Sequence, residues 1–262
     1  MSRGYIIPDR KEIETSVRLA GEYGCAFEYN DFFVPEVLDD PVKQEEIIEF
    51  YARYRSDFSN DTMHGAFLDV TIHSSDPLIR DASILRIHQS MEIAKRMGLK
   101  GVVFHTGRLA GFRSEKYLQL WHDVNRWFFT ELAESYPQQQ IYMENMFDEA
   151  PDVLAKLAES MKDVKNFGIC LDYAHAALSD FPLQGWLGTL APYILHMHVN
   201  DNNLKDDLHQ PVGAGQIDWK TFDSLIRKHQ IEATTLIEVS SCEGQEKSLK
   251  YMRQHEIYPF CA

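Results

Sequence analysis

Six short apolar segments of this chain end in a residue that can bind a metal ion. They are residues 62–64, 102–105, 141–144, 170–172, 195–198 and 236–238, whose last members are His64, His105, Glu144, Asp172, His198 and Glu238. The last four offer three carboxylates and one imidazole, a mixed oxygen and nitrogen set that suits Mn²⁺, Mg²⁺ or Co²⁺, with Zn²⁺ also possible. Six such endings in succession predict side chains that converge at one end of a parallel barrel, where barrels of this kind carry their chemistry.

The elements that must position these residues alternate regularly along the chain. We expect strands at 4–7, 25–29, 62–64, 101–105, 141–144, 167–172, 193–199 and 234–238, and helices at 13–23, 41–56, 78–98, 114–135, 151–162, 184–191, 218–229 and 245–255. Strands that are apolar on both faces and alternate with helices indicate a parallel sheet covered by helices. Eight repeats, with no glycine-rich phosphate fingerprint after the first strand, favour a closed (β/α)₈ barrel over an open dinucleotide-binding sheet. No linker or composition break divides residues 1–262, so we predict a single domain.

Length, charge and cysteine content restrict the class of protein. The chain has 262 residues, 44% of them hydrophobic, and such barrels typically need about 250 residues. The formal net charge of −14 disfavours non-specific nucleic-acid binding, unless a basic patch or bound metals invert the field. The four cysteines form no CxxC motif and no run approaches the roughly 20 apolar residues of a membrane span. We therefore expect a cytoplasmic protein with reduced thiols and no membrane partner.

Each candidate ligand, taken alone, has a structural explanation. A histidine on an apolar strand is more often a packed core residue than a ligand, and a glutamate near a strand end is usually solvated or next to a helix start. For Glu144, Asp172, His198 and Glu238 the metal interpretation is favoured, because adjacent strands lie about 5 Å apart and one barrel register predicts all four together.

Other residues extend this set around the rim of the predicted barrel. They are His64, His105, His175, Asp207 and His209. A structural role is as well supported as ligation for four of them, whereas we expect His175 to contact substrate or a second metal. Glu28, at the end of the second expected strand, either lines the pocket floor or forms an ion pair. We expect His196 to point away from His198, towards the helix layer.

Six motifs, in this order and spacing, resemble a known superfamily. They are ValValPheHisThrGly at 102–107, TyrMetGluAsn at 142–145, CysLeuAspTyrAlaHisAla at 170–176, HisMetHisValAsnAsp at 196–201, AspLeuHisGlnProValGlyAlaGlyGlnIleAspTrp at 207–219 and LeuIleGluVal at 236–239. The chain resembles the xylose-isomerase-like TIM barrels over nearly its whole length. That group includes sugar and sugar-phosphate isomerases and epimerases, inosose-processing enzymes and the endonuclease IV family. The motifs are characteristic of the superfamily and not of one activity.

The resemblance to the ketose epimerases of this group implies a one-metal site. It carries the four metal ligands over to Glu144, Asp172, His198 and Glu238, and the acid–base roles to Glu144 and Glu238. His175 would then orient a substrate oxygen. Such an enzyme moves a proton through an enediolate, giving an epimer, or an isomer if the proton returns to the neighbouring carbon.

The resemblance to the endonuclease IV family implies a different site, in which nine ligands hold three zinc ions. All nine types have a counterpart here: His64, His105, Glu144, Asp172, His175, His198, Asp207, His209 and Glu238. A site with several metals can clamp the attacking and leaving oxygens of a phosphodiester. Many of these nine residues also resemble those of the sugar-isomerase relatives. The presence of all nine therefore does not decide between the ketose epimerases and the endonuclease IV family.

Three features favour a small sugar over DNA as the substrate. The chain is acidic, the expected mouth loops after the first, second, sixth and seventh strands are short and carry no cluster of arginines and lysines, and no glycine-rich loop follows Glu144. Arg108 and Arg113, in the basic segment 108–116, could hold one phosphate or carboxylate, although a solvated helix start explains them equally well. Five aromatic residues could wall a sugar pocket or fill the core: Phe67, Phe104, Phe147, Trp186 and Trp219.

We therefore predict a sugar or sugar-phosphate isomerase or epimerase that depends on a divalent metal. Its partner is a small sugar, nucleic acid is not expected, and a homo-oligomer is possible. The alternatives are an endonuclease IV-like phosphodiesterase that uses up to three zinc ions, and a barrel that binds a sugar without turnover.

Overall fold

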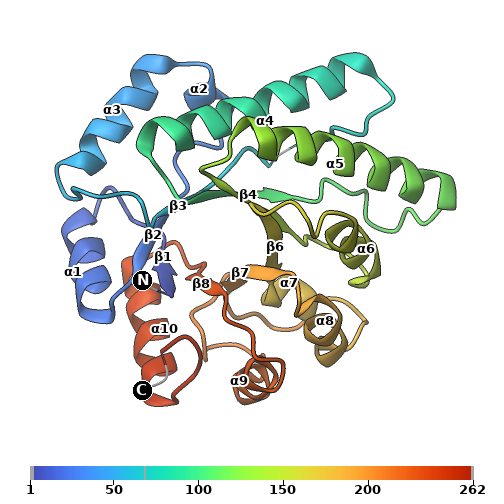
Figure 1. Cartoon of the computed structure of the whole chain (residues 1–262). Coiled ribbons are helices and arrows are strands. Elements are labelled where there is room, and N and C mark those ends of the chain that lie inside the picture. Colours follow the sequence, from blue (N-terminus) through green and yellow to red (C-terminus); the bar gives the residue numbers. More distant parts are fainter. Residues whose placement is uncertain (1–2, 68, 261–262) are drawn as a thin grey trace. The chain divides into compact units, whose positions relative to one another are not determined.

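The structure is a computed structural model that describes residues 3–67 and 69–260. Its eight strands follow one another in a closed order from β1 to β8, with helices between them (Figure 1). The strand pairs described below are parallel. The predicted (β/α)₈ barrel is confirmed. Short strands that are apolar on both faces satisfy this fold, because one face lines the barrel interior and the other lies under the helices.

The strands and helices lie close to their predicted positions. The strands are β1 (Gly4–Ile6), β2 (Ala26–Tyr29), β3 (Thr62–His64), β4 (Gly101–His105), β5 (Gln140–Glu144), β6 (Phe167–Asp172), β7 (Ile194–Val199) and β8 (Thr234–Ile237). The helices are α1 (Ile13–Tyr23), α2 (Pro35–Leu38), α3 (Pro41–Ala52), α4 (Pro77–Met97), α5 (Glu115–Ser135), α6 (Asp152–Ser160), α7 (Tyr173–Ala177), α8 (Leu183–Leu190), α9 (Trp219–Lys228) and α10 (Cys242–Gln254). The short helices α2 and α7 were not predicted from the sequence.

Capping residues set the ends of these helices. The Asp76 side chain accepts a hydrogen bond from Leu78 N at 2.9 Å, which begins α4 directly before Pro77. Gly98 ends α4 in the left-handed conformation with φ 69°, as its position after the last periodic residue predicts. The last helix, α10, begins at Cys242 and not at residue 245, because the Ser241 hydroxyl caps it by accepting from Gly244 N.

The chain forms two compact units, which are interleaved in sequence. The first unit comprises the described residues of Met1–Glu28, Asn145–Ala155 and Ile169–Ala262, and the second comprises those of Tyr29–Glu144 and Lys156–Gly168. In the first unit β1 pairs with β2 and β8, and β7 pairs with β6 and β8. In the second unit β4 pairs with β3 and β5.

Strand register places several candidate ligands at the same level within each unit. In the second unit, His105 on β4 is the partner of Glu144 on β5. In the first unit, Asp172 on β6 is the partner of His198 on β7. Because the partners lie at or next to the ends of their strands on the same side, their side chains can meet without any contribution from a loop.

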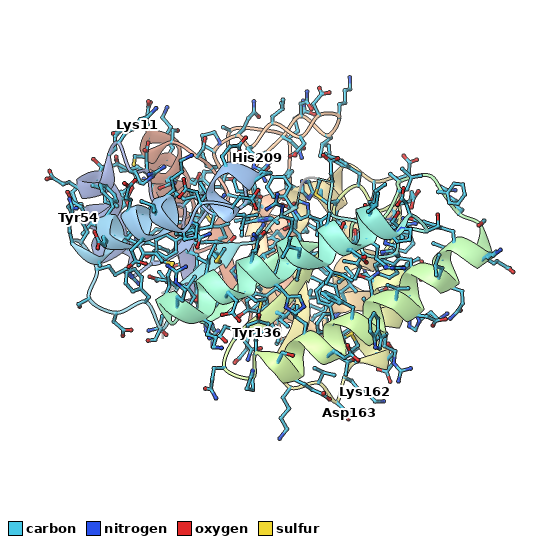
Figure 2. The ribbon with its side chains drawn as sticks, turned by 90° about the horizontal axis from the view of Figure 1, so that it is seen from above. Lys11, Tyr54, Tyr136, Lys162, Asp163 and His209 are labelled. Carbon is cyan, nitrogen blue, oxygen red and sulfur yellow. The ribbon has the colours of Figure 1, made fainter. Side chains whose placement is uncertain are left out.

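The two longest helices cover the second unit. The helices α4 and α5 lie side by side in both views, and Tyr136, which follows α5, donates a hydrogen bond from its hydroxyl to Glu92 Oε1 on α4 at 2.8 Å (Figures 1 and 2). Among the described residues, no helix is long and apolar enough to cross a membrane. The described cysteines Cys25, Cys170 and Cys242 are buried and form no disulfide, and Cys261 lies outside the described residues.

Candidate metal centre

The first group of ligands, the strand cluster, lies in the second unit and comprises His64, His105 and Glu144. These residues are the last of three consecutive strands, β3, β4 and β5. His64 Nε2 lies 3.1 Å from His105 Nε2, and these two nitrogens lie 3.4 Å and 3.3 Å from Glu144 Oε2. The structure therefore brings together two imidazole nitrogens and one carboxylate oxygen that the sequence places at three separate strand ends.

The tautomer of His64 follows from its other ring nitrogen. His64 Nδ1 lies 2.9 Å from the carbonyl oxygen of Gly65. A carbonyl only accepts hydrogen bonds, so Nδ1 carries the proton and Nε2 presents its lone pair to the cluster. The ring of Phe67 packs against the rings of both His64 and His105, with centroid separations of 4.9 Å and 4.8 Å. This apolar contact restricts the orientation of both imidazoles.

The separations within the strand cluster fit a metal ion. Zinc binds nitrogen and oxygen ligands at about 2.0–2.1 Å, so neighbouring ligand atoms of a tetrahedral site lie about 3.3 Å apart. The three measured separations, 3.1, 3.3 and 3.4 Å, match one face of such a tetrahedron. These side chains could therefore hold a divalent ion with little movement.

A second group, the loop cluster, lies in the first unit and comprises His175, Asp207 and His209. His175 Nε2 and His209 Nε2 lie 3.3 Å and 3.2 Å from Asp207 Oδ2. The Nδ1 atoms face carbonyl oxygens, that of Asn145 at 3.0 Å from His175 and that of Glu238 at 3.0 Å from His209. Asp207 Oδ1 is buried and has no hydrogen-bond partner among the described residues, as expected of an oxygen that could bind a metal ion.

Asp201 supports the segment that carries Asp207 and His209. The buried Asp201 carboxylate accepts hydrogen bonds from Gly213 N at 2.9 Å, Ile217 N at 3.1 Å and Trp219 Nε1 at 2.8 Å. The backbone of Asp201 also pairs with that of Gln210 in both directions at 2.8 Å. Residue 215 must be glycine here, because a Cβ would collide with the Asp201 carboxylate. The ValGlyAlaGlyGlnIleAspTrp motif thus closes a loop around one buried acid.

Electrostatics within the loop cluster shift two pKa values in opposite directions. Burial would raise the pKa of Asp207, but hydrogen bonds from His175 and His209 hold it well below its usual range. Burial would likewise lower the pKa of His209, but its hydrogen bond to Asp207 and the nearby Glu238 carboxylate raise it to about 9. Without a metal, His209 is therefore protonated at neutral pH and forms an ion pair with Asp207.

A third group, also in the first unit, contains Asp172, His198 and Glu238. Each offers a ligand atom within 4.8 Å of the others, and His198 Nδ1 lies 3.6 Å from Glu238 Oε2. Asp172 Oδ1 accepts a hydrogen bond from His175 N at 2.6 Å and so caps α7. This cap is the physical reason for the unpredicted helix, and it joins Asp172 directly to the loop cluster.

Glu28 and His196 have a role that the sequence did not settle. Glu28 Oε2 lies 3.0 Å from His196 Nε2, and Glu28 Oε1 lies 3.0 Å from His198 Nε2. The expectation that His196 points away from His198 is wrong, because residues two apart on a strand share a face. Burial would raise the pKa of Glu28, but His198 and His196 hold it below its usual range. The structure therefore places the Glu28 carboxylate against two imidazoles.

The remaining candidates divide between the surface, the core and the clusters. Arg108 and Arg113 lie between β4 and α5, the first half-buried and the second exposed. Three of the five aromatic residues are buried in the core: Phe104, Trp186 and Trp219. Phe147 is half-exposed with its ring 5.4 Å from that of His175, and Phe67 contacts the strand cluster.

Comparison with known proteins places this geometry in context. Residues 17–255 match the model of a family described as xylose isomerase-like TIM barrel. The TTHB071 protein from Thermus thermophilus, in a structure soaked with ZnCl₂, has a TM-score of 0.76 over 97% of each chain at 21% sequence identity. A D-tagatose 3-epimerase-like protein has a TM-score of 0.75 over 96% of each chain at 23% identity. A probable endonuclease 4 from Citrifermentans bemidjiense is 22% identical over 188 residues, which cover 64% of this chain and 65% of that protein. The two structural likenesses show the fold, and the names of the D-tagatose 3-epimerase-like protein and the probable endonuclease 4 give different activities.

Proposed function

Because the chain belongs to the xylose isomerase-like TIM barrel family, we propose that it is a divalent-metal-dependent enzyme that isomerises or epimerises a sugar or sugar phosphate. The observation that carries the proposal is the group of Asp172, His198 and Glu238, whose ligand atoms lie within 4.8 Å of one another. Glu144 ends β5, which precedes β6 in the closed strand order, and is the fourth ligand of the proposed site. A D-tagatose 3-epimerase-like protein has the same fold, which supports this choice of reaction.

The proposed chemistry is a proton transfer at carbon. A bound divalent ion would polarise a substrate carbonyl and its neighbouring hydroxyl, which makes the C–H between them more acidic. Glu144 and Glu238 are the acid–base pair: one carboxylate removes the proton, and the other returns a proton to the opposite face. Return to the same carbon gives an epimer, and return to the neighbouring carbon of the enediolate gives an isomer.

Other residues have positioning roles in this proposal. Glu238 is the more accessible of the two glutamates, with its side chain 13% exposed against 1% for Glu144. His175 would orient a substrate oxygen through Nε2, since its Nδ1 faces the carbonyl of Asn145. Arg108 and Arg113 would hold a phosphate if the substrate carries one, because a guanidinium binds phosphate through paired hydrogen bonds.

Hydrogen exchange tests the reaction directly. The purified protein, loaded in turn with Mn²⁺, Co²⁺, Mg²⁺ and Zn²⁺, is incubated in D₂O with a panel of ketoses and ketose phosphates. We expect deuterium at the carbon next to the carbonyl of at least one recovered sugar, together with its epimer or isomer. The absence of deuterium incorporation across the panel with every metal would refute the proposed proton transfer.

A second candidate function is a phosphodiesterase that uses several metals. The observation that favours it is the pair of clusters, each of which brings two imidazole nitrogens within 3.4 Å of a carboxylate oxygen. A one-metal epimerase needs no such nitrogen pairs, whereas a phosphodiesterase with several ions would use both. The probable endonuclease 4 among the relatives supports this alternative.

Metal content and DNA cleavage separate the two candidates. One Mn or Co per chain, with sugar turnover, supports the isomerase or epimerase. Close to three Zn per chain, with nicking of a duplex that contains one abasic site, supports the phosphodiesterase. An undamaged duplex of the same sequence is the control for contaminating nucleases.

A further inference from the structure

A chain of buried polar groups lies behind His198 in the first unit. His196 Nδ1 lies 2.6 Å from Thr234 Oγ1, and His196 Nε2 lies 3.0 Å from Glu28 Oε2. The other oxygen, Glu28 Oε1, lies 3.0 Å from His198 Nε2. The side chains of Glu28, His196 and His198 are all fully buried. One carboxylate therefore lies between two imidazoles, and only one of those imidazoles belongs to the proposed metal site.

The position of Glu28 favours one tautomer of His198. A carboxylate oxygen and an unprotonated ring nitrogen would repel each other at 3.0 Å, because both atoms carry negative partial charge. A proton on His198 Nε2 removes this repulsion and leaves Nδ1 unprotonated. Nδ1 is the nitrogen that lies 3.6 Å from Glu238 Oε2, on the side of the proposed ligands.

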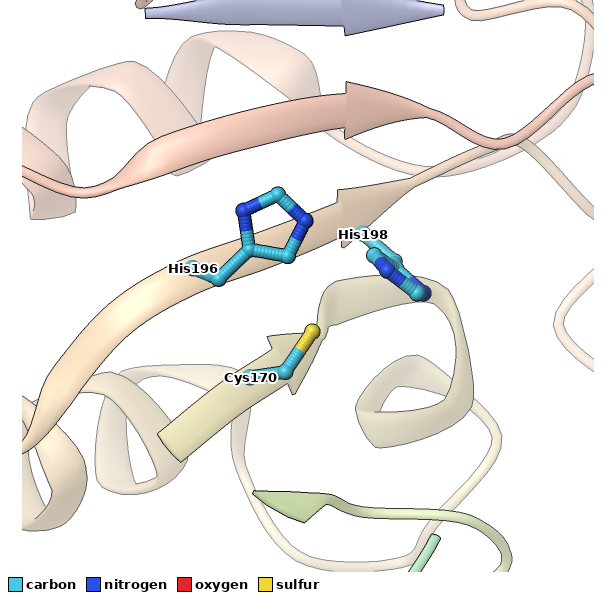
Figure 3. Close-up of side chains that lie close together, drawn as sticks. All are labelled: Cys170, His196 and His198. Atoms are coloured by element: carbon cyan, nitrogen blue, oxygen red, sulfur yellow. The ribbon is translucent and has the colours of Figure 1, made fainter. Parts of the chain in front are cut away.

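Cys170 completes this buried group but does not make it a further metal site. Figure 3 shows Cys170 on β6 beside His196 and His198 on β7, and the three offer ligand atoms within 4.8 Å of one another. The Nε2 atoms of both histidines lie 3.0 Å from oxygens of Glu28, and His196 Nδ1 lies 2.6 Å from Thr234 Oγ1. The cluster is therefore better described as a polar network of Glu28, His196 and Thr234 beside which His198 and the Cys170 thiol lie.

We propose that Glu28 is a positioning residue, which fixes His198 as the Nε2-protonated tautomer and directs Nδ1 towards the metal, while His196 holds the Glu28 carboxylate in place. This inference rests on the proposed function for the metal itself. Carboxylates that hold a metal-binding histidine from behind typically contribute 10–100-fold to metal affinity. Glu28 performs this role from β2, on the opposite side of His198 from Glu238.

Two substitutions test this role through metal binding. Glu28→Gln keeps the side-chain volume but removes the charge, and its amide NH₂ must face one of the two imidazoles. We expect Glu28→Gln to weaken binding of Mn²⁺ or Zn²⁺ about 10–100-fold in a chelator competition titration. Cys170→Ala is the matched control, since it alters the same buried group and leaves Glu28 and His198 in place. We expect it to change the affinity less than about threefold.

The tautomer of His198 gives a readout independent of any variant. In ¹⁵N-histidine-labelled wild-type protein without metal, two-bond ¹⁵N–¹H correlation spectra should show His198 protonated at Nε2 and unprotonated at Nδ1. A His198 protonated at Nδ1 would overturn the inference, even if Glu28→Gln failed to fold. Wild-type affinity in Glu28→Gln, or equal losses in Glu28→Gln and Cys170→Ala, would also overturn it. A wild-type protein that binds no divalent ion would refute the proposed function, while the tautomer would still decide the role of Glu28.

Discussion

The strand cluster and the loop cluster bring the same ligand types together with different supports. His64, His105 and Glu144 end three consecutive strands, and the register between β4 and β5 pairs His105 with Glu144. Asp207 and His209 lie instead in the segment between β7 and α9, where His209 adopts a positive φ of 46°. The side chains of His64 and Glu144 are 4% and 1% exposed, whereas those of His209 and Asp207 are 38% and 22% exposed.

The difference shows what each kind of support requires. Parallel pairing determines where a strand ends, so the strand cluster needs only the register and the packing of Phe67. A loop has no such template, and the loop cluster depends on Asp201, whose carboxylate accepts hydrogen bonds from four N–H groups. We therefore expect the loop cluster to be the more easily disrupted of the two, and the more sensitive to pH.

The largest effect should come from the glutamates that belong to the proposed chemistry. Glu144→Gln, in the strand cluster, and Glu238→Gln, in the first unit, should each lower turnover at least about 10²–10⁴-fold, because an amide can neither accept nor return the proton. Deuterium incorporation into the substrate measures this loss. Glu232→Gln, at an exposed ion pair with Arg3, is the matched control. Near-normal exchange in Glu238→Gln, with an intact fold by circular dichroism, would refute its role.

A second test uses the raised pKa of His209. With a pKa of about 9, His209 must release a proton before it can bind a metal, so affinity at the loop cluster should rise about tenfold per pH unit from pH 7 to 9. Isothermal titration of Zn²⁺ in buffers of different ionisation enthalpy should detect this proton. His209→Gln should flatten the pH dependence while metal still binds at the strand cluster. An equally steep dependence in His209→Gln would contradict this assignment.

Asp201→Asn tests the support of the loop cluster. The amide NH₂ that replaces one carboxylate oxygen would face N–H donors and could not accept their hydrogen bonds. We therefore expect the free energy of unfolding, measured by urea denaturation, to fall by about 1–3 kcal/mol. The metal capacity of the loop cluster should fall and that of the strand cluster should persist. Asp218→Asn, which alters only the exposed cap of α9, should lower the free energy of unfolding by about 1 kcal/mol or less. Equal stability of Asp201→Asn and wild type would show that the loop does not depend on this acid.

The smallest expected effect is on the stability of the metal-free protein. The folded pKa of His209 is raised above its unfolded value near 6.5, so the stabilisation it provides is complete below pH 6.5 and is lost as pH rises through 9. Because His209 is partly exposed, solvent screening limits the resulting change in the free energy of unfolding to less than about 1 kcal/mol. Urea midpoints at pH 6 and pH 9.5 should therefore differ slightly more in wild type than in His209→Gln. A larger difference between the two urea midpoints in His209→Gln than in wild type would contradict this prediction.

Much of the fold could be predicted because its signals are local. Apolar runs, capping residues such as Asp76 and the glycine at residue 98 each act over a few residues, and the structure has all eight predicted strands in their places. The sequence does not predict α7, because its capping residue, Asp172, is interpreted there only as a metal ligand. A short side chain at the end of a strand can serve both purposes, and sequence alone did not reveal the second one.

For the candidate site, the sequence predicts which residues take part but not how their side chains contact one another. The strand endings identify the members of the strand cluster, since strand ends on one side of a parallel sheet must lie together. The members of the loop cluster follow from the motifs at 170–176 and 207–219. The pairing of Glu28 with both His196 and His198 could not be anticipated, because it joins residues at least 168 positions apart in the chain. The same holds for Asp201, whose partners Gly213, Ile217 and Trp219 surround it only once the loop has closed.

The sequence by itself determined the alternation of elements, the closed barrel and the types of ligand at the strand ends, because hydrophobic period and capping act locally. Only the tertiary structure decided which nitrogens face which oxygens, and that a buried glutamate lies behind His198. These features depend on side-chain orientation at distances near 3 Å, which long-range packing sets and which no local pattern encodes.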